Sequence, residues 1–384
     1  MNTKLLGSSL IISGTALGAG MLAIPMVLAQ FGLWYGTLLM IFICFGTTYA
    51  ALLLLEATLK TGSGLGLNSI ARQTLGKPGQ FVTNLLLYAL LICLLMAYIL
   101  GAADLLGQFT SFIGLDVSLQ HSQIAFTLVS GIIIACGTGA VDKLNRLLFF
   151  VMIISLGLSL LILLPDFKVA NIAHIVNSDK VDLIKTSAVL FTSFGFMVVI
   201  PSLAAYNHEA DDKQLRNMII IGSMIPLICY LCWLFAVVGN LRPDQLGEFS
   251  NVSELILAFG DSSQWIGTIL SVFTGLALLT SFFGVAMSLY NQNRDTFGQN
   301  RVVTYVLTFI LPLAGALLAA DKFLAVLSYA GIILVFLAVF VPLAMVYVVR
   351  SQNMESKRYK AEGGNIMLLF SLGFGVFLIA SQLI

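Results

Sequence analysis

Two stretches of the chain place glycine beside small or hydroxyl-bearing residues in the middle of long apolar runs. The first is SGTALGAG, from Ser13 to Gly20, followed by Pro25, and the second is TSFGF, from Thr192 to Phe196, followed by Pro201. Glycine and proline favour a break in a helix, and a break inside hydrocarbon leaves backbone N–H and C=O groups without partners. A bound zwitterion supplies such partners, because helix N-termini bind carboxylates and freed carbonyls accept hydrogen bonds from an ammonium. The two stretches predict a binding site for an amino-acid-sized zwitterion.

The elements that must position these residues are membrane-spanning helices. Hydrophobic residues make up 59% of the chain and charged residues 10%, whereas soluble domains carry about 25% charged residues. A span needs about 20 mostly apolar residues. On this basis we expect an all-α integral membrane protein with eleven transmembrane helices. They cover residues 5–31, 35–59, 81–111, 122–141, 146–165, 183–206, 215–239, 264–291, 303–320, 323–349 and 365–384.

The loops between these spans carry basic residues asymmetrically. If the N-terminus is cytoplasmic, 14 of the 19 lysine and arginine residues lie on the cytoplasmic side and 5 lie on the other side. Cytoplasmic loops of membrane proteins are enriched in Lys and Arg. We therefore expect a cytoplasmic N-terminus and, because the number of spans is odd, a C-terminus on the outer side.

The two glycine-containing stretches lie in the first and the sixth expected spans. Five spans separate their entry points, so the two helices enter the membrane from opposite sides, as inverted repeats require. For either span alone the alternative is a packing glycine, because glycine lets membrane helices approach closely. We expect one transporter domain over residues 1–384, with a first five-helix repeat at 1–165, a second at 183–349 and an additional helix at 365–384.

Several longer motifs resemble the bacterial aromatic amino acid permeases. They are GTALGAGMLAIP from Gly14, LLLLEATLK from Leu52, TGSGLGLNSIARQTLGKPGQ from Thr61, FTSFGF from Phe191 and LRNMIIIGSMIPL from Leu215. Over essentially the whole chain the sequence is most similar to tyrosine-specific permeases, with tryptophan permeases next. The family belongs to the amino acid, polyamine and organocation superfamily. The resemblance therefore implies a LeuT-like fold, a 5+5 inverted repeat with broken helices 1 and 6 and one added helix.

The same resemblance implies a function. It is secondary uptake of L-tyrosine, with tryptophan or phenylalanine as alternative substrates, by proton symport and alternating access. The protein would lie in a bacterial inner membrane and would carry its substrate into the cytoplasm, so that the C-terminus would be periplasmic.

The broken-helix pattern of the superfamily, matched onto this chain, implies which residues form the substrate site. The backbone of Gly18, Ala19 and Gly20 would bind the substrate carboxylate, while Thr15 and Ser193 would lie near the amine. The pocket for the substrate side chain would contain Tyr98, Gly101, Phe194, Gly195, Phe196, Ser281 and Val285.

Aromatic walls in this pocket suit an aromatic ligand, because offset stacking adds about 0.5–1.5 kcal/mol beyond the burial of area. One departure from the family concerns the same region. The aromatic permeases usually carry a His-Gly pair just after the sixth-span motif, and this chain has Met197 and Val198 there. A hydrogen-bonding group is therefore missing from the expected pocket.

Transport must be powered by an ion gradient or be passive, because the chain has no G-x-x-x-x-G-K-[ST] nucleotide motif. Glu56 and Asp104 are carboxylates within or beside spans and are the candidates for carrying a proton. For Glu56 the alternative is an ion pair with Lys60, four residues further on. For Asp104 the alternative is a polar residue at the wet end of a span.

Sodium coupling is the rival to proton coupling. In sodium-coupled members of the superfamily, hydroxyls of the eighth span and carbonyls of the first bind the ion. The matching residues here are Ser13, Ala16, Ala277, Thr280 and Ser281. Oxygen ligands suit a hard cation, although Ser and Thr also bond back to their own helix. We prefer protons because the aromatic permeases are generally proton-driven.

Other functional classes fit the sequence poorly. The formal net charge is +1 and no long basic run occurs, so no nucleic-acid partner is expected. A membrane-embedded enzyme would need converging catalytic groups at membrane depth, and the spans are nearly free of His, Lys and Arg. The expected partners are an amino acid, a coupling ion and the lipid bilayer, with no cofactor and no metal site other than the alternative sodium site.

Overall fold

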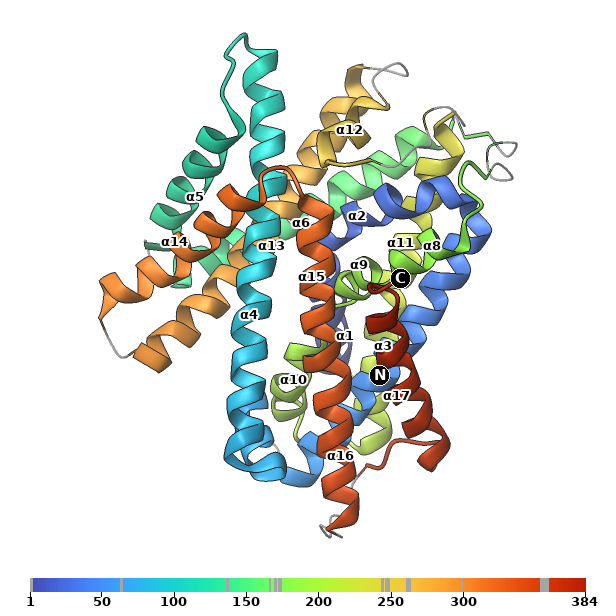
Figure 1. Cartoon of the computed structure of the whole chain (residues 1–384), viewed down its shortest axis with the longest axis vertical. Coiled ribbons are helices and arrows are strands. Elements are labelled where there is room, and N and C mark those ends of the chain that lie inside the picture. The colour runs from blue at the N-terminus through green and yellow to red at the C-terminus, as the bar shows by residue number, and fades with distance from the viewer. Residues whose placement is uncertain are drawn as a thin grey trace.

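The protein is a bundle of helices (Figure 1). The computed structural model describes residues 3–62, 65–135, 138–165, 167–168, 171, 175–242, 245, 249–259, 264–297, 300–352 and 359–384. In this part of the chain, eight helical stretches are apolar and long enough to cross a membrane. The expectation of an all-helical integral membrane protein is confirmed at this level.

The broken first helix consists of α1 (Thr3–Ala16) and α2 (Ala19–Leu28), and the broken sixth consists of α9 (Ser187–Ser193), η2 (Met197–Val199) and α10 (Ile200–Tyr206). The other helices are η1 (Ala29–Phe31), α3 (Gly32–Thr61), α4 (Leu67–Phe112), α5 (Leu119–Ala135), α6 (Thr138–Leu163), α8 (Lys180–Lys185), α11 (Asp212–Asn240), α12 (Val252–Leu257), α13 (Gln264–Phe297), α14 (Arg301–Ala319), α15 (Phe323–Val335), the π-helical η3 (Phe336–Phe340), α16 (Val341–Ser351) and α17 (Gly364–Ala380).

The eight long stretches divide the chain differently from the eleven expected spans. The stretch Gly20–Thr61 holds both the second half of the expected first span and the expected second span, and Gly32, with φ +71°, marks the turn between them. The helices α5 and α17 are apolar and have 17 described residues each, at the lower end of the range of about 17–25 residues that cross a bilayer. The count of eleven and the LeuT-like inverted repeat stay predictions.

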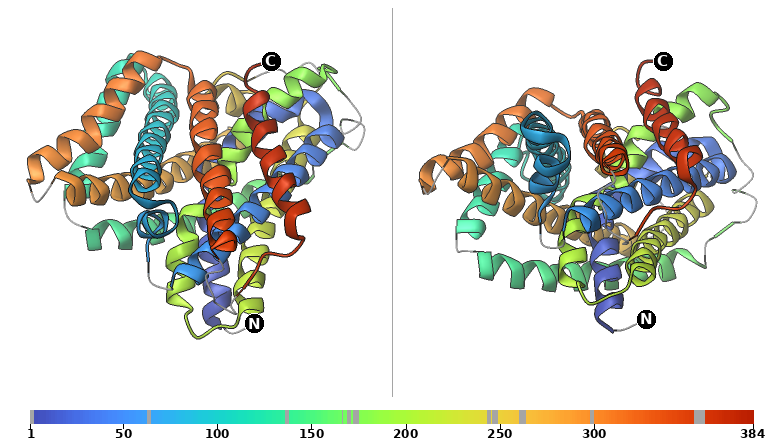
Figure 2. Two further views of the ribbon diagram at one scale, coloured as in Figure 1. Left: turned by 60° about the horizontal axis from the view of Figure 1, so that its bottom comes forward. Right: turned by 90° about the horizontal axis from the view of Figure 1, so that it is seen from below.

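The broken helices lie in the interior of the bundle. In Figure 1, α1, α9 and α10 lie between α4 and α3. Helix α11 packs along α1, and α15 packs along α9. Helices α5 and α14 form one edge of the molecule, and α17 lies toward the opposite edge (Figure 2). The segments with glycine-rich breaks are therefore enclosed by protein, as irregular backbone at membrane depth must be.

A buried ion pair joins the ends of α3 and α16 and the segment before α17, away from these breaks. The Glu56 side chain is 0% exposed, and its carboxylate accepts hydrogen bonds from the Arg350 guanidinium at 2.9 and 2.7 Å and from the Ala361 N–H at 2.9 Å. The Lys60 ammonium lies 3.6 Å away, so the pair expected from sequence is present, beside a bidentate and closer partner. Glu56 thus ties α3 to α16 and to the segment that leads into α17. Proton carriage by Glu56 stays a prediction.

Removing the Glu56 carboxylate should destabilise the protein strongly. Glu56→Ala leaves the Arg350 guanidinium, whose side chain is only 14% exposed, without its partner, and breaking a buried pair from one side costs about 3–5 kcal/mol. We expect a clear fall in the melting temperature of the purified protein in detergent. The matched control is Glu362→Ala, because Glu362 pairs with Arg216 but its side chain is 79% exposed. Equal losses of melting temperature in the two variants would contradict a special role for the Glu56 pair.

Candidate functional site

Two interruptions of helical structure occur where the glycine-containing stretches predicted them. Helix α1 ends at Ala16 and α2 begins at Ala19, with Gly18 in an extended conformation (φ −161°) between them. Helix α9 ends at Ser193, and residues 194–196 are not helical before the 3₁₀ turn begins at Met197. The first N–H groups of a helix have no intrahelical acceptor. The start of α2, at Ala19 and Gly20, therefore presents free donors and the positive end of a helix dipole.

The two interruptions contact each other through glycine. A Cβ atom added to Gly20 would lie 2.7 Å from the Ser193 Cα, and one added to Gly18 would lie 2.2 Å from the Ser281 Oγ. The Ser193 hydroxyl donates a hydrogen bond of 2.9 Å to the Gly20 carbonyl. Neither position has room for a side chain. The absence of one at both glycines allows α2, α9 and α13 to pack closely.

Tyr230 of α11 joins the two interrupted helices and was not found by sequence reasoning. Its hydroxyl lies 2.7 Å from the Ala16 carbonyl oxygen and 2.6 Å from the Ser193 carbonyl oxygen. These are the last residues of α1 and α9. The Tyr230 side chain is 0% exposed, and its ring packs edge-on against Phe194 with the ring centroids 5.1 Å apart. A tyrosine in the middle of an apolar helix carries no pattern that would have marked it.

A large cavity reaches from these interruptions to one end of the bundle. Its volume is about 800 Å³, within the range of ligand-binding cavities. The polar groups on its wall include the hydroxyls of Thr15, Tyr98, Thr192, Thr280, Ser281 and Ser288 together with Asn145 and Arg146. Leu10 and Ile11, on the N-terminal half of α1, line the cavity and are 53% and 50% exposed. The cavity therefore extends along α1 toward the end of the bundle where that helix begins.

The opposite end is closed above the interruptions. There the Asp104 carboxylate of α4 accepts hydrogen bonds from the Ser253 N–H at 2.8 Å and from the Ser253 hydroxyl at 2.6 Å. Ser253 belongs to the first turn of α12, where a carboxylate is favoured. Beside this contact lies a small cavity of about 30 Å³, between Gly101, Asp104, Val252 and Phe323. Asp104 therefore holds α12 over the closed end.

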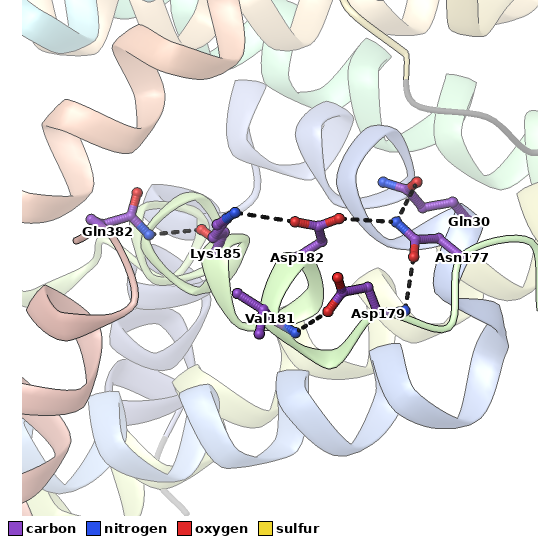
Figure 3. Close-up of polar contacts among 7 residues, drawn as sticks. All are labelled: Gln30, Asn177, Asp179, Val181, Asp182, Lys185 and Gln382. Atoms are coloured by element: carbon purple, nitrogen blue, oxygen red, sulfur yellow. Dashed lines mark hydrogen bonds and ion pairs between the residues drawn. The ribbon is translucent and has the colours of Figure 1, made fainter. Parts of the chain in front are cut away.

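A second set of contacts ties the closed ends of the two interrupted helices together (Figure 3). The Gln30 carbonyl, just past α2, accepts hydrogen bonds of 2.9 Å from the N–H groups of Val176 and Asn177, which precede α8. The Asn177 amide lies 3.4 Å from an Asp182 oxygen. The Gln382 amide near the C-terminus donates to the Lys185 carbonyl at 2.7 Å. The first and sixth helices are thus joined at this end. They also meet at the other end, where the Asn207 amide donates to the Ser8 hydroxyl at 2.8 Å and the Lys4 ammonium lies 4.5 Å from the centroid of the Tyr206 ring. The cavity lies between these two helices and the helices α4, α6 and α13.

Most of the residues expected in the substrate site line the large cavity. Thr15, Gly18, Gly20, Tyr98, Gly195, Ser281 and Val285 are on its wall. The Tyr98 hydroxyl and Ser281 are hydrogen-bonded to each other across α4 and α13. Gly101 borders the small cavity at the closed end instead. Ala19 begins α2 beside the cavity, so its backbone belongs to the same helix start.

The two expected aromatic walls have a different place in this conformation. Phe194 and Phe196 are both 0% exposed and are not part of the cavity wall, whose aromatic residues are Tyr98 and Phe149. Met197, at the position of the family histidine, is also buried, whereas Val198 lines the cavity. Ser193 lies behind the wall with its hydroxyl on Gly20. The cavity therefore presents more hydroxyl groups than aromatic faces.

The residues of the alternative sodium site each have other partners. The Ser13 carbonyl accepts from the Leu17 N–H at 2.8 Å, and the Ala16 carbonyl accepts from Tyr230. The Thr280 hydroxyl donates to the Leu276 carbonyl at 2.9 Å and lies 3.2 Å from the Ala277 carbonyl. The sodium site stays a prediction from resemblance.

Comparison with known proteins shows which family the sequence matches. The sequence matches the family model described as the tryptophan/tyrosine permease family over residues 1–382. It is 59% identical to a protein named Glutamine transporter 2 from Aliivibrio fischeri, over 100% of both chains. It is 35% identical to Tyrosine-specific transport system 1 of Haemophilus influenzae, over 98% of this chain and 95% of that protein. It is 32% identical to a Tryptophan-specific transport protein of Pseudomonas aeruginosa, over 97% of this chain and 93% of that protein.

The contact between Gly20 and Ser193 generates a prediction. Gly20→Ala should abolish binding of a transported amino acid, because the new methyl group would lie 2.7 Å from the Ser193 Cα and displace the start of α2. Gly18→Ala should be milder, since the Ser281 hydroxyl that it meets can rotate away. Gly7→Ala is the control, because a Cβ at this glycine of α1 meets nothing within 4 Å. Substrate binding by purified variants measures the effect. Unchanged affinity in Gly20→Ala would rule out the helix start as the carboxylate site.

Proposed function

Because the chain belongs to the tryptophan/tyrosine permease family, we propose that it is a secondary transporter that imports an L-amino acid across the bacterial inner membrane, with glutamine as the first candidate substrate. The family consists of permeases, so the chain is not an enzyme. The observation that carries the proposal is the helix start at Ala19 and Gly20, which borders a cavity large enough for an amino acid.

Two observations favour glutamine over the aromatic substrate that the family resemblance implied. Identity to the protein named as a glutamine transporter is 59%, against 35% to the one named as tyrosine-specific. The cavity wall also suits a carboxamide, because the Ser281 and Tyr98 hydroxyls can both donate and accept hydrogen bonds. The Thr192 hydroxyl can accept one, since its own proton is donated to the Ala188 and Leu327 carbonyls. Phe194 and Phe196, which would stack on an aromatic ring, are buried outside that wall. Tyrosine is the second candidate, supported by the family and by the relatives of that name.

The transport cycle follows from the unequal closure of the two ends. With a cytoplasmic N-terminus, as the basic residues predict, the cavity opens to the cytoplasm and the contact between Asp104 and Ser253 closes the periplasmic side. The conformation is then the one that releases substrate. The substrate carboxylate lies on the N–H groups at the start of α2, and the side chain points toward Ser281 and Tyr98. Opening to the periplasm requires the Asp104 contact to break and the helices around the cavity to close.

Uptake into proteoliposomes tests the substrate. We expect labelled glutamine to accumulate under an imposed gradient, and excess unlabelled glutamine to compete better than excess tyrosine or tryptophan. Accumulation of tyrosine with no uptake of glutamine would transfer the assignment to the second candidate. No accumulation of any of the three under a proton or a sodium gradient would refute the proposed function.

Asp104 is the better candidate for proton coupling, because Glu56 is held by Arg350 and Lys60. Breaking of the contact with Ser253 would let the Asp104 carboxylate exchange a proton with the periplasm. Asp104→Asn removes the titratable group and keeps an oxygen that can accept from the Ser253 N–H.

We therefore expect Asp104→Asn to lose accumulation driven by a pH gradient while it still exchanges internal for external substrate. Asp321→Asn is the control, because Asp321 lines the same small cavity but is exposed. Accumulation by Asp104→Asn at the wild-type level would exclude Asp104 as the proton carrier.

A further inference from the structure

The ends of two half-helices converge on one point inside the bundle. Ala16 is the last residue of α1, and Ser193 is the last residue of α9. The C-terminal end of a helix carries a partial negative charge, because its last carbonyls have no intrahelical donor. In transporters with discontinuous helices, such ends and the adjacent unwound carbonyls coordinate a coupling cation. Electrostatics alone therefore favours a positive charge between the Ala16 and Ser193 carbonyls.

The hydroxyl of Tyr230 occupies that point. It lies 2.7 and 2.6 Å from the two carbonyl oxygens, so a cation bound by both oxygens would have to take the place of the hydroxyl. The hydroxyl carries a single proton, which the two carbonyls share in a three-centre bond of the kind common at helix ends. The Tyr230 ring is held in place by packing, because the residue is 0% exposed and its ring packs edge-on against Phe194.

The surroundings of Thr280 give an independent observation on the alternative sodium site. The Thr280 hydroxyl points at the Leu276 carbonyl of its own helix and lies 3.8 Å from the Met152 sulfur of α6. A thioether is a soft ligand, whereas sodium is a hard cation that binds oxygen. The Ser13 hydroxyl is also engaged, with the Gly222 carbonyl at 2.9 Å. At the Tyr230 junction and at Thr280, uncharged groups of the protein thus bond the carbonyls and hydroxyls that a bound cation would otherwise coordinate.

We propose that the Tyr230 hydroxyl takes the place of a bound cation at the junction of the two interrupted helices, so that substrate binding and transport require no sodium. This inference rests on the proposed function. Tyr230 is a positioning residue, because it fixes the ends of α1 and α9 relative to each other and touches neither the cavity nor the substrate. A fixed neutral donor holds the same junction in every ionic medium.

The test compares three purified variants with the wild type. Tyr230→Phe keeps the ring and removes the hydroxyl. Tyr230→Asn removes the ring as well and leaves room, beside an amide oxygen, for a hydrated cation between the two carbonyls. Tyr49→Phe is the matched control, because the Tyr49 hydroxyl is likewise bonded to a backbone carbonyl, that of Glu362, but far from the junction.

For the wild type we expect the same glutamine uptake and melting temperature in sodium chloride and in choline chloride. Tyr230→Phe should bind substrate about tenfold more weakly in either salt, as the loss of one buried hydrogen bond implies, and Tyr49→Phe should bind normally. Tyr230→Asn should acquire a sodium dependence, seen as a higher melting temperature and faster uptake in sodium than in choline. A purely structural tyrosine would not produce this ion dependence.

Two results would overturn the inference. One is a wild type whose uptake or melting temperature depends on sodium, a result that needs no variant to fold. The other is a folded Tyr230→Asn that responds equally to sodium and choline. Failure of the proposed function is a separate outcome, because a protein that transports none of the three amino acids still reports through its melting temperature whether sodium binds.

Discussion

The structure depends on one constraint, which is that every backbone N–H and C=O group inside hydrocarbon needs a partner. Two broken helices in the bundle interior leave backbone N–H and C=O groups without helical partners at two places. Neighbouring side chains bond some of these groups. The Tyr230 hydroxyl bonds the carbonyls that end α1 and α9, and the Ser193 hydroxyl links α9 to α2 through the Gly20 carbonyl. The donors at the start of α2 remain for a ligand. The binding site proposed above is therefore the start of α2, whose first N–H groups have no acceptor within their own helix.

The same constraint explains why the two ends of the bundle differ. At the closed end, polar groups form specific hydrogen bonds, between Asp104 and Ser253 and between Gln30 and the two residues Val176 and Asn177 before α8. At the other end α1 stays bonded to the end of α10, through Ser8 and Asn207, and the cavity lies between α1 and the helices α4, α6 and α13. Contacts of a few hydrogen bonds are weak enough to exchange during a transport cycle, unlike the densely packed junction at Tyr230.

Sequence reasoning succeeded where the cause of a feature is local. The interruptions follow from glycine, proline and small residues within a few positions, and the Glu56–Lys60 contact follows from helical spacing. It missed Tyr230, Ser253 and Arg350, because each acts on a residue far along the chain and has no distinctive neighbours. The sequence also could not predict where the Phe194 and Phe196 side chains lie, since an aromatic residue beside a break can turn toward the cavity or toward the core. Here the Tyr230 ring offers Phe194 a partner in the core.

The Glu56–Arg350 pair has a consequence for how the protein is made. Its members are 294 residues apart, and at a synthesis rate of about 5–20 residues per second the ribosome needs roughly 15–60 s to pass from one to the other. During that interval the newly inserted α3 carries its carboxylate without the guanidinium that finally holds it. Lys60, one helical turn away, is already present and can neutralise Glu56 from the start. The weaker and more local partner thus precedes the stronger one, and the Glu56 contacts are complete only when Arg350 and then Ala361 have been added, shortly before α17.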